Sequence, residues 1–300
     1  MTDRPTRLEF GSAAILGACL CVSVASIMTK ALLAHAPVLP VVFAQVLAST
    51  VVVWAVAAAR GRLPRGRTGL RLATPGLLAP GLQYLAAYGG LAMTPVSIEG
   101  VLFALEATLV ALLAWPLLRE RPSRQTRVSI ALGTVGVVLI SWRDTGDARI
   151  PLAGVALILA GVACGALDTL VSRVLAPEAD PLTMTAAVHA AGLAVVAATV
   201  LGTGAATGAA SWTFLRAPGT LAVVVVSGVL LHGVATLGFV AALQHTTAAR
   251  AAALFPSIAV FNTLGGYVVL GERLWGVQLG GGVLVVAAAL LVARPARDSA

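Results

Sequence analysis

Two carboxylates stand out in the sequence because they interrupt an apolar run that is long enough to cross a bilayer. Glu99 and Glu106 lie in SIEGVLFALEATLVALLAWPLL, residues 97–118. Seven residues of helix separate two side chains by roughly 10 Å along one face. A charge at the centre of a membrane costs about 3 kcal/mol on insertion scales, so such residues face water, pair with a partner or become protonated.

The two carboxylates differ in their expected surroundings. Glu99 lies in the first turn of the expected helix, where the helix dipole favours an anion, so it could be an interfacial carboxylate. The other interpretation is that Glu99 binds substrate or takes part in proton coupling. Glu106 lies near the middle of that helix. We expect Glu106 to face a central aqueous cavity, where it carries a coupling proton or binds substrate. A structural hydrogen bond to a neighbouring helix is the alternative.

Other polar residues at similar depth could contribute to the same cavity. Asp168 lies among small residues that allow close helix packing, so it could face the cavity or form a structural contact. His189 and His232 could join Glu106 in a proton path, because unperturbed histidine titrates at about 6.5. The remaining candidates for substrate binding or proton coupling are Gln45, Gln83, Tyr84, Tyr88 and Asn262. Each of these could instead form a packing hydrogen bond.

The composition indicates the elements that must position these residues. Of 300 residues, 59% are hydrophobic and 11% are charged, whereas a soluble domain has about 25% charged residues. Apolar runs near 20 residues, the length of a bilayer-spanning helix, recur between short polar patches. We predict an all-α integral membrane protein with ten transmembrane helices and no soluble domain. The expected spans are 11–33, 38–59, 71–93, 96–118, 126–142, 152–175, 182–202, 218–242, 248–270 and 274–293.

The basic residues indicate how these helices are oriented. If the N-terminus is cytoplasmic, 15 of the 20 Lys and Arg residues fall on the cytoplasmic side and 5 on the other. This bias favours a topology in which both termini are cytoplasmic, and it explains the net charge of +8 without nucleic acid. Arg250 opens the ninth expected helix, where it could be a membrane anchor or a cytoplasmic gate. Pro80 and Pro256 are expected to kink the third and ninth helices.

The sequence contains an internal repeat. Residues 92–122 align with residues 244–274 at a constant offset of 152, which places Glu120-Arg121 on Glu272-Arg273. We therefore predict two five-helix repeats, 1–147 and 148–300. Two copies of a bundle with an odd number of helices must insert in opposite orientations. Such inverted repeats are typical of secondary transporters, whose substrate site lies near the membrane midplane.

The two repeats differ at the position of Glu106. The offset of 152 places Ile258 opposite Glu106. We therefore expect a site in which only one repeat contributes the central carboxylate.

The ten-helix duplication, with LLRERPSRQ and VLGERLWGVQLGG after the fourth helix of each half, resembles the EamA-type family of the drug/metabolite transporter superfamily. In this family the fourth helix typically ends in a G-E-R-like turn. The second copy matches it with Gly271, Glu272 and Arg273, whereas the first has Arg119 in place of the glycine. The resemblance implies secondary transport of amino acids, other metabolites or drugs. It also implies a helix-two position that is often arginine but is Gln45 here.

The glutamates of the two turns, Glu120 and Glu272, lie at the C-terminal ends of expected helices. The helix dipole disfavours an anion at a C-terminal end. Because Glu120 and Glu272 lie there beside Arg121 and Arg273, we expect them to be structural ties at the membrane surface.

Motifs of other function classes are missing from the sequence. Its single lysine, Lys30, lies in no phosphate-binding loop, and neither H-E-x-x-H nor G-x-S-x-G occurs. Cys19, Cys21 and Cys164 have neither a zinc-site spacing nor a disulfide framework. We therefore expect no enzyme activity, no metal and no cofactor.

These inferences predict an exporter of small polar metabolites, such as amino acids, that works by alternating access and proton exchange. Efflux of drugs or cationic compounds is the main alternative, and passive facilitation is the third. The expected partners are a small-molecule substrate, protons and the lipid bilayer. The preference for Ala, and for Arg over Lys, suggests a GC-rich bacterial genome and hence a bacterial inner membrane.

Overall fold

The computed structural model of the chain describes residues 7–118, 124–140, 150–204, 209–245 and 254–293. These residues are mainly helical and include no strand. Glu120, Arg121 and Arg250 lie outside them, as does the predicted boundary between the two repeats at residues 147 and 148.

The helical segments follow the expected spans. The first half contains α1 (Arg7–Leu33), α2 (Val38–Ala59), α3 (Gly66–Ala73), η1 (Leu77–Leu82), α4 (Gln83–Met93), α5 (Val96–Phe103), α6 (Glu106–Leu118) and α7 (Arg124–Ile140). The second contains α8 (Leu152–Leu175), η2 (Ala176–Glu178), α9 (Pro181–Gly202), η3 (Ala209–Arg216), α10 (Pro218–Gly228), η4 (Val229–Ala235), α11 (Thr236–Leu243), α13 (Pro256–Leu270) and α14 (Gly276–Ala293). The bounds of α2 and α8 agree with the predicted spans.

Several of these helices have the properties of membrane spans. Among the described residues, five stretches are long and apolar enough to cross a membrane: Ala13–Leu33, Val38–Ala59, Leu152–Glu178, Pro181–Gly202 and Pro218–Leu243. Pro256–Leu270 and Gly276–Ala288 are shorter apolar helices. Large apolar side chains such as Val51, Leu201 and Val268 are exposed on the outside of the bundle. Such exposure is typical of a surface that contacts lipid.

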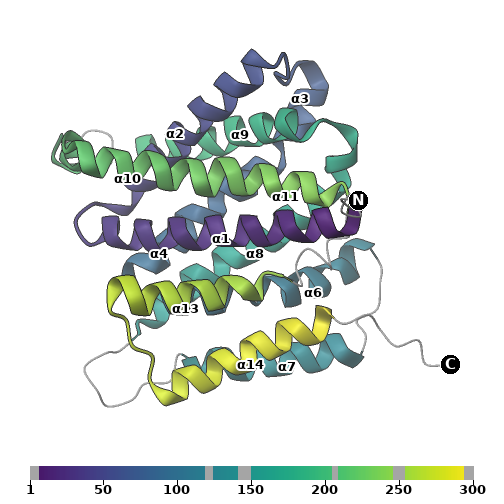
Figure 1. Ribbon diagram of the computed structural model, residues 1–300, viewed down its shortest axis with the longest axis vertical. Coiled ribbons are helices and arrows are strands. Elements are labelled where there is room, and N and C mark those ends of the chain that lie inside the picture. The colour runs from purple at the N-terminus through teal and green to yellow at the C-terminus, as the bar shows by residue number, and fades with distance from the viewer. Residues whose placement is uncertain (1–6, 119–123, 141–149, 205–208, 246–253, 294–300) are drawn as a thin grey trace, which may run out of the picture.

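The helices lie side by side in rows (Figure 1). α1 begins and α14 ends on the same side of the bundle, at the right of the view. Helices at equivalent places in the two halves pack against each other, because α2 contacts α9, α5 contacts α13 and α7 contacts α14. The halves therefore meet about a common pseudo-symmetric interface.

One hydrogen bond occurs in the same way in each half. Lys30 Nζ donates to the carbonyl oxygen of Leu91 over 2.8 Å, and Arg173 Nη1 donates to that of Leu243 over 3.0 Å. Leu91 and Leu243 are 152 residues apart, the offset of the sequence repeat. In each half, a cation near the end of the first helix thus satisfies a carbonyl at the end of the third.

The third helix of each half is irregular at the same place. η1 contains Pro80, and beside it Ala79 has a non-helical backbone with φ −132° and ψ 126°. The equivalent segment η4 is a π-helix that begins 152 residues after η1 begins. Wide helical turns of this kind are often found at functional sites.

Two other helices differ from expectation. The predicted fourth helix is divided, because α5 ends at Phe103 and α6 begins at Glu106. Glu106 therefore opens a helix and does not lie in the middle of one. Pro256 occupies the first turn of α13, after a turn at residues 254–255. A first-turn proline suits a helix start, so the expected kink at Pro256 is not found in the described helix.

Candidate functional site

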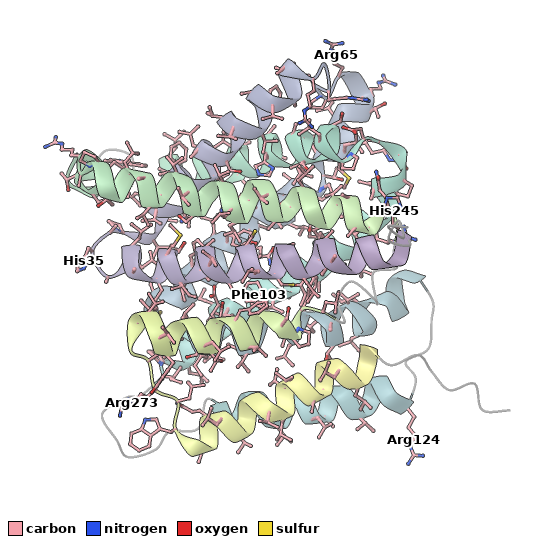
Figure 2. The ribbon with its side chains drawn as sticks, viewed as in Figure 1. His35, Arg65, Phe103, Arg124, His245 and Arg273 are labelled. Carbon is pink, nitrogen blue, oxygen red and sulfur yellow. The ribbon has the colours of Figure 1, made fainter. Side chains whose placement is uncertain are left out.

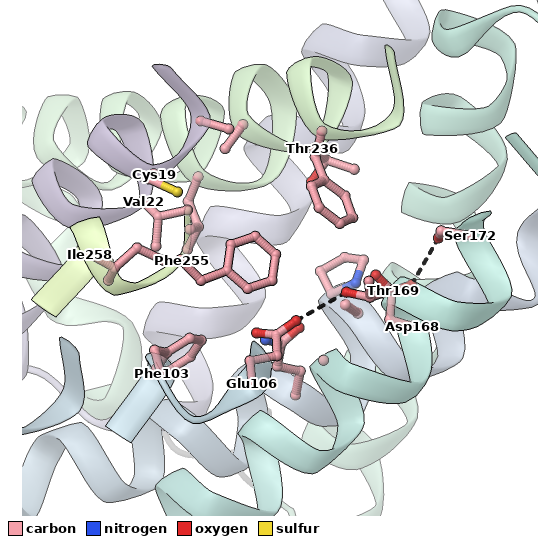
Figure 3. Close-up of a pocket in the computed structure, with 18 of the residues that line it drawn as sticks. Cys19, Val22, Phe103, Glu106, Asp168, Thr169, Ser172, Thr236, Phe255 and Ile258 are labelled. Carbon is pink, nitrogen blue, oxygen red and sulfur yellow. Dashed lines mark hydrogen bonds between the residues drawn. The ribbon is translucent and has the colours of Figure 1, made fainter. Parts of the chain in front are cut away.

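A cavity of about 100 Å³ lies between the two halves of the chain (Figure 3). Both halves contribute their third and fourth helices to its lining. Five pairs of lining residues are related by the offset of 152: Ala79 and Leu231, Gln83 and Ala235, Tyr84 and Thr236, Phe103 and Phe255, and Glu106 and Ile258. The cavity is thus formed where the equivalent segments of the two repeats meet.

The two repeats give the cavity different chemistry. The first supplies Gln83, Tyr84 and Glu106 where the second supplies Ala235, Thr236 and Ile258. Polar residues of α8 lie beside the carboxylate, and they are Asp168, Thr169 and Ser172. The apolar part of the wall is extended by Phe239, Val240 and Phe255. The cavity can therefore accommodate a solute with one polar and one apolar end.

Glu106 is held against α8. Its side chain is buried, and the Thr169 hydroxyl donates to Oε1 over 3.0 Å. Gly165 allows this close approach. A Cβ atom at Gly165 would lie 2.5 Å from Gln83 Nε2 and 3.1 Å from Glu106 Oε2. One carboxylate oxygen is thus bound by Thr169, and the other lies near the Gln83 amide.

A second carboxyl group lines the same cavity. Asp168 Oδ1 accepts a hydrogen bond from the Ser172 hydroxyl over 3.3 Å, one turn along α8. Figure 3 shows Asp168 beside Thr169, its neighbour in the chain, and the Thr169 hydroxyl is the group that donates to Glu106. Neither Lys nor Arg occurs among the described residues that line this cavity. Two acidic groups therefore share one small space without a basic neighbour in its described wall.

Other predicted site residues form a polar layer beside the cavity. Gln45 Nε2 donates to Thr29 Oγ1 over 2.8 Å and to Ser227 Oγ over 2.7 Å. His189 contacts Ser49 through Nε2 at 3.0 Å and the Thr185 carbonyl through Nδ1 at 2.8 Å. Gln45 and His189 are buried and are not part of the cavity lining.

Tyr84 connects this polar layer with the cavity. Its ring packs edge-on against His232, with centroids 4.6 Å apart, and against Tyr88 at 5.6 Å. The Thr29 hydroxyl lies 3.4 Å from the Tyr88 hydroxyl. Of these aromatic residues only Tyr84 lines the cavity. A direct contact between either histidine and Glu106 is not found in the described residues, so the histidines are neighbours of the site.

Glu99 and Asn262 form a separate pair. Glu99 is 1% exposed, and Asn262 Nδ2 donates to its Oε2 over 3.3 Å. Glu99 is therefore buried between α5 and α13 and does not face water. Neither residue lines the cavity. Glu99 does lie in the first turn of α5, as predicted, but α13 packs against α5 and separates the carboxylate from water.

A model of the EamA-like transporter family matches residues 9–142 and 152–294. The chain belongs to the EamA-like transporter family. It is therefore a membrane transporter of the drug/metabolite transporter superfamily, and the two matches correspond to its two repeats.

A solved structure has a similar fold. The structure titled "Crystal structure of protein" is 19% identical, covers 96% of both chains and has a TM-score of 0.64. At this identity the likeness shows the fold alone. No curated protein matches the sequence significantly.

The EamA-like turn after α13 has a clear structural role. Gly271 has φ +68°, a left-handed conformation that glycine readily adopts at a helix end. Glu272 then accepts hydrogen bonds from Val96 N at 2.8 Å, from Ser97 N at 3.1 Å and from Ser97 Oγ at 2.8 Å. It therefore caps the start of α5 in the other repeat. Figure 2 shows Arg273 at the edge of the molecule, pointing away from the helices.

Several lining residues were not among the predicted site residues. Phe103 and Phe255 face the cavity, and Figure 2 shows Phe103 at the centre of the molecule. The repeat could have identified this pair, because both positions are aromatic and 152 residues apart. Thr169 and Gly165 carried no such signal, since their roles depend on how α8 packs against Glu106.

Proposed function

We propose that the chain is a secondary transporter that exports small polar metabolites across a bacterial cytoplasmic membrane by alternating access. Both termini would be cytoplasmic, and the two repeats would be inverted. The observation that supports this proposal is the position of Glu106, in a buried cavity formed by equivalent segments of both repeats. Inverted-repeat transporters bind their substrates at such interfaces.

In the proposed cycle, Glu106 exchanges a proton for the substrate. The ionised carboxylate binds a donor or cationic group of the substrate, while Thr169 holds Oε1 and the Gln83 amide lies near Oε2. After the repeats rearrange, a proton from outside neutralises Glu106 and releases the substrate. The neutral site then returns to the cytoplasmic side. Because one carboxylate serves both ligands, substrate and proton compete and their movements are coupled.

A second candidate, efflux of organic cations, is favoured by the chemistry of the wall. Glu106 and Asp168 are both acidic, and no basic residue lies among the described lining residues. Phe103, Phe255 and Tyr84 supply aromatic rings that can pack on a cation. The carboxylate of a zwitterionic amino acid would find no cationic partner in this described wall. An amine with an apolar body would find a partner for each of its ends in this wall, and this favours the second candidate.

The coupling role predicts the behaviour of Glu106→Gln. In proteoliposomes, a pH gradient should drive substrate accumulation by the unmodified protein. The variant should lose at least about 90% of this accumulation. It should still exchange labelled for unlabelled substrate. A glutamine retains hydrogen-bonding atoms but cannot release a proton. Glu178→Gln makes the same change at the half-exposed partner of Arg71 and should remain coupled. Gradient-driven accumulation in Glu106→Gln would contradict the proposal.

A matched pair of competitors distinguishes the candidate substrates. An amino acid and its methyl ester differ in whether the carboxylate is present, so the ester is a cation with the same side chain. Stronger competition by the ester would support cation efflux, and stronger competition by the free amino acid would support metabolite export. Transport that is unaffected when the gradient is collapsed would instead support a passive facilitator.

A further inference from the structure

Of the four buried side-chain oxygen atoms that lack a hydrogen-bond partner among the described residues, one is Gln45 Oε1 on α2, and the other three lie on α1, α5 and α13, outside the cavity. These three are Ser23 Oγ, Glu99 Oε1 and Asn262 Oδ1. Their side chains are at most 1% exposed. Buried polar atoms in native proteins nearly always have a partner. Three such atoms on helices that pack against one another, α1, α5 and α13, are therefore free to bind a ligand.

A short contact joins two of these residues, and the helical spacing of α1 brings Ser23 to the same face as a third neighbour, Ser26. Asn262 donates to Glu99 Oε2 at 3.3 Å, and the Ser26 side chain lies near enough to Glu99 to act on its carboxylate. Ser23 lies three residues before Ser26, on the same face of α1. Gly100 permits the close packing, because a Cβ atom there would lie 2.5 Å from the Cβ of Asn262. The cluster thus joins the first repeat to α13 of the second.

The chemistry of the cluster favours a cation. The three unpartnered atoms are a carboxylate, an amide and a hydroxyl oxygen, and each of them can accept a hydrogen bond or bind a hard cation. One carboxylate among neutral oxygens suits a single positive charge. The charged groups that act on Glu99 are Lys30 and Glu272. Their formal charges and that of Glu99 leave one negative charge, which one monovalent cation would balance.

We propose that Glu99, Asn262, Ser23 and Ser26 form a sodium site, separate from the central cavity. Lys30 does not fill it, because its ammonium group donates to Leu91 O while Glu99 Oε1 and Asn262 Oδ1 accept no hydrogen bond from the described residues. Helix α5 connects this site with the cavity. α5 carries Glu99 and ends at Phe103, which lines the cavity. Sodium would therefore fix one wall of the cavity, and bound substrate would in turn strengthen sodium binding.

The first test measures binding without transport. The purified full chain is melted in sodium, potassium or choline chloride at one ionic strength and one pH. Sodium at ten times its dissociation constant should raise the melting temperature by about 2–4 °C relative to choline. Glu99→Gln should abolish this difference, and Glu106→Gln should retain it. An equal melting temperature in all three salts would overturn the proposal, whatever the outcome for transport.

Ser23→Ala provides a second test that does not depend on a charge change. If sodium binds, loss of this ligand should weaken the apparent sodium affinity about fivefold to tenfold, with little change in choline. If no ligand is present, the substitution removes an unsatisfied buried hydroxyl and should stabilise the protein equally in both salts. That second result would overturn the site. So would a stability that depends on pH through Glu99 but never on sodium, since the ligand would then be a proton.

Other titratable groups could also make the stability depend on pH, so melting temperatures in sodium and in choline are always compared with each other at the same pH. The titratable groups that face Glu99 from packed elements are Lys30 of α1, Tyr84 and Tyr88 of α4, and Glu272 after α13.

Discussion

At the scale of single residues, the central site depends on Gly165. Its missing side chain lets the Gln83 amide and the Glu106 carboxylate approach α8. We predict that Gly165→Ala folds, because Gln83 Nε2 is the end of a flexible side chain that can move. The displaced amide should lower substrate affinity about tenfold, equivalent to the loss of about one hydrogen bond. Isothermal titration or substrate-dependent melting would measure this change.

A matched glycine distinguishes this effect from a change in helix propensity. Gly17 lies in α1, and a Cβ atom there would meet nothing within 4 Å. Gly17→Ala should therefore leave substrate affinity unchanged and stabilise the protein by up to about 1 kcal/mol. Equal affinities of Gly165→Ala and the unmodified protein would show that the Gln83 position does not matter for binding.

What the sequence reveals at this scale depends on whether a residue has a local signal. Glu106 has one, because a carboxyl group in an apolar run requires a polar environment. Asn262 was a candidate for the same reason, but its partner could not be predicted, since its contact with Glu99 joins residues 163 positions apart. The surroundings of Glu99 were mispredicted because they also depend on a distant segment. Its first-turn position suggested water, but α13 covers it. Long-range packing therefore determines the polar pairs.

At the scale of helices, bounds were predictable where proline precedes the helix. Pro37 and Pro151 stand directly before α2 and α8 and do not continue a preceding helix. The break between α5 and α6 has no such marker, because LFALEATL contains neither proline nor glycine. Its cause must be tertiary. Propensity alone favours a continuous helix there, and so the N-terminal position of Glu106 could not be predicted.

The cap that joins the two repeats predicts the effect of changing Glu272. Glu272→Ala removes three hydrogen bonds from the first turn of α5 and should destabilise the protein by about 1–3 kcal/mol. Amide hydrogen exchange within Val96–Phe103 should accelerate more than exchange in α9. Arg273→Ala is the matched control, because that side chain points away from the helices. Unchanged protection of α5 in Glu272→Ala would contradict the capping role.

At the scale of the whole molecule, the repeat is the most predictive feature of the sequence. One offset relates the irregular segments η1 and η4, the paired carbonyl caps and five pairs of cavity residues. A site shared by two such halves can open to one side when the repeats move against each other. In the proposed cycle, the two repeats themselves would provide the gates of the central cavity.

Cys19 offers a direct test of this movement. It is a free cysteine, 2% exposed, on the cavity wall (Figure 3). In a Cys21→Ala/Cys164→Ala background, an impermeant thiol reagent should label Cys19 only when the cavity opens to the side of the reagent. Cys19→Ser gives the background signal.

Alternating access requires that labelling from the two sides changes in opposite directions. The comparison uses inside-out and right-side-out vesicles, with Glu106 or with Glu106→Gln, which resembles the protonated state. If the variant favours one open state, labelling from that side should rise and labelling from the other should fall, each by severalfold. A channel has a single open state, so both rates would rise or fall together. Parallel changes would therefore reject alternating access, even if substrate still crosses the membrane.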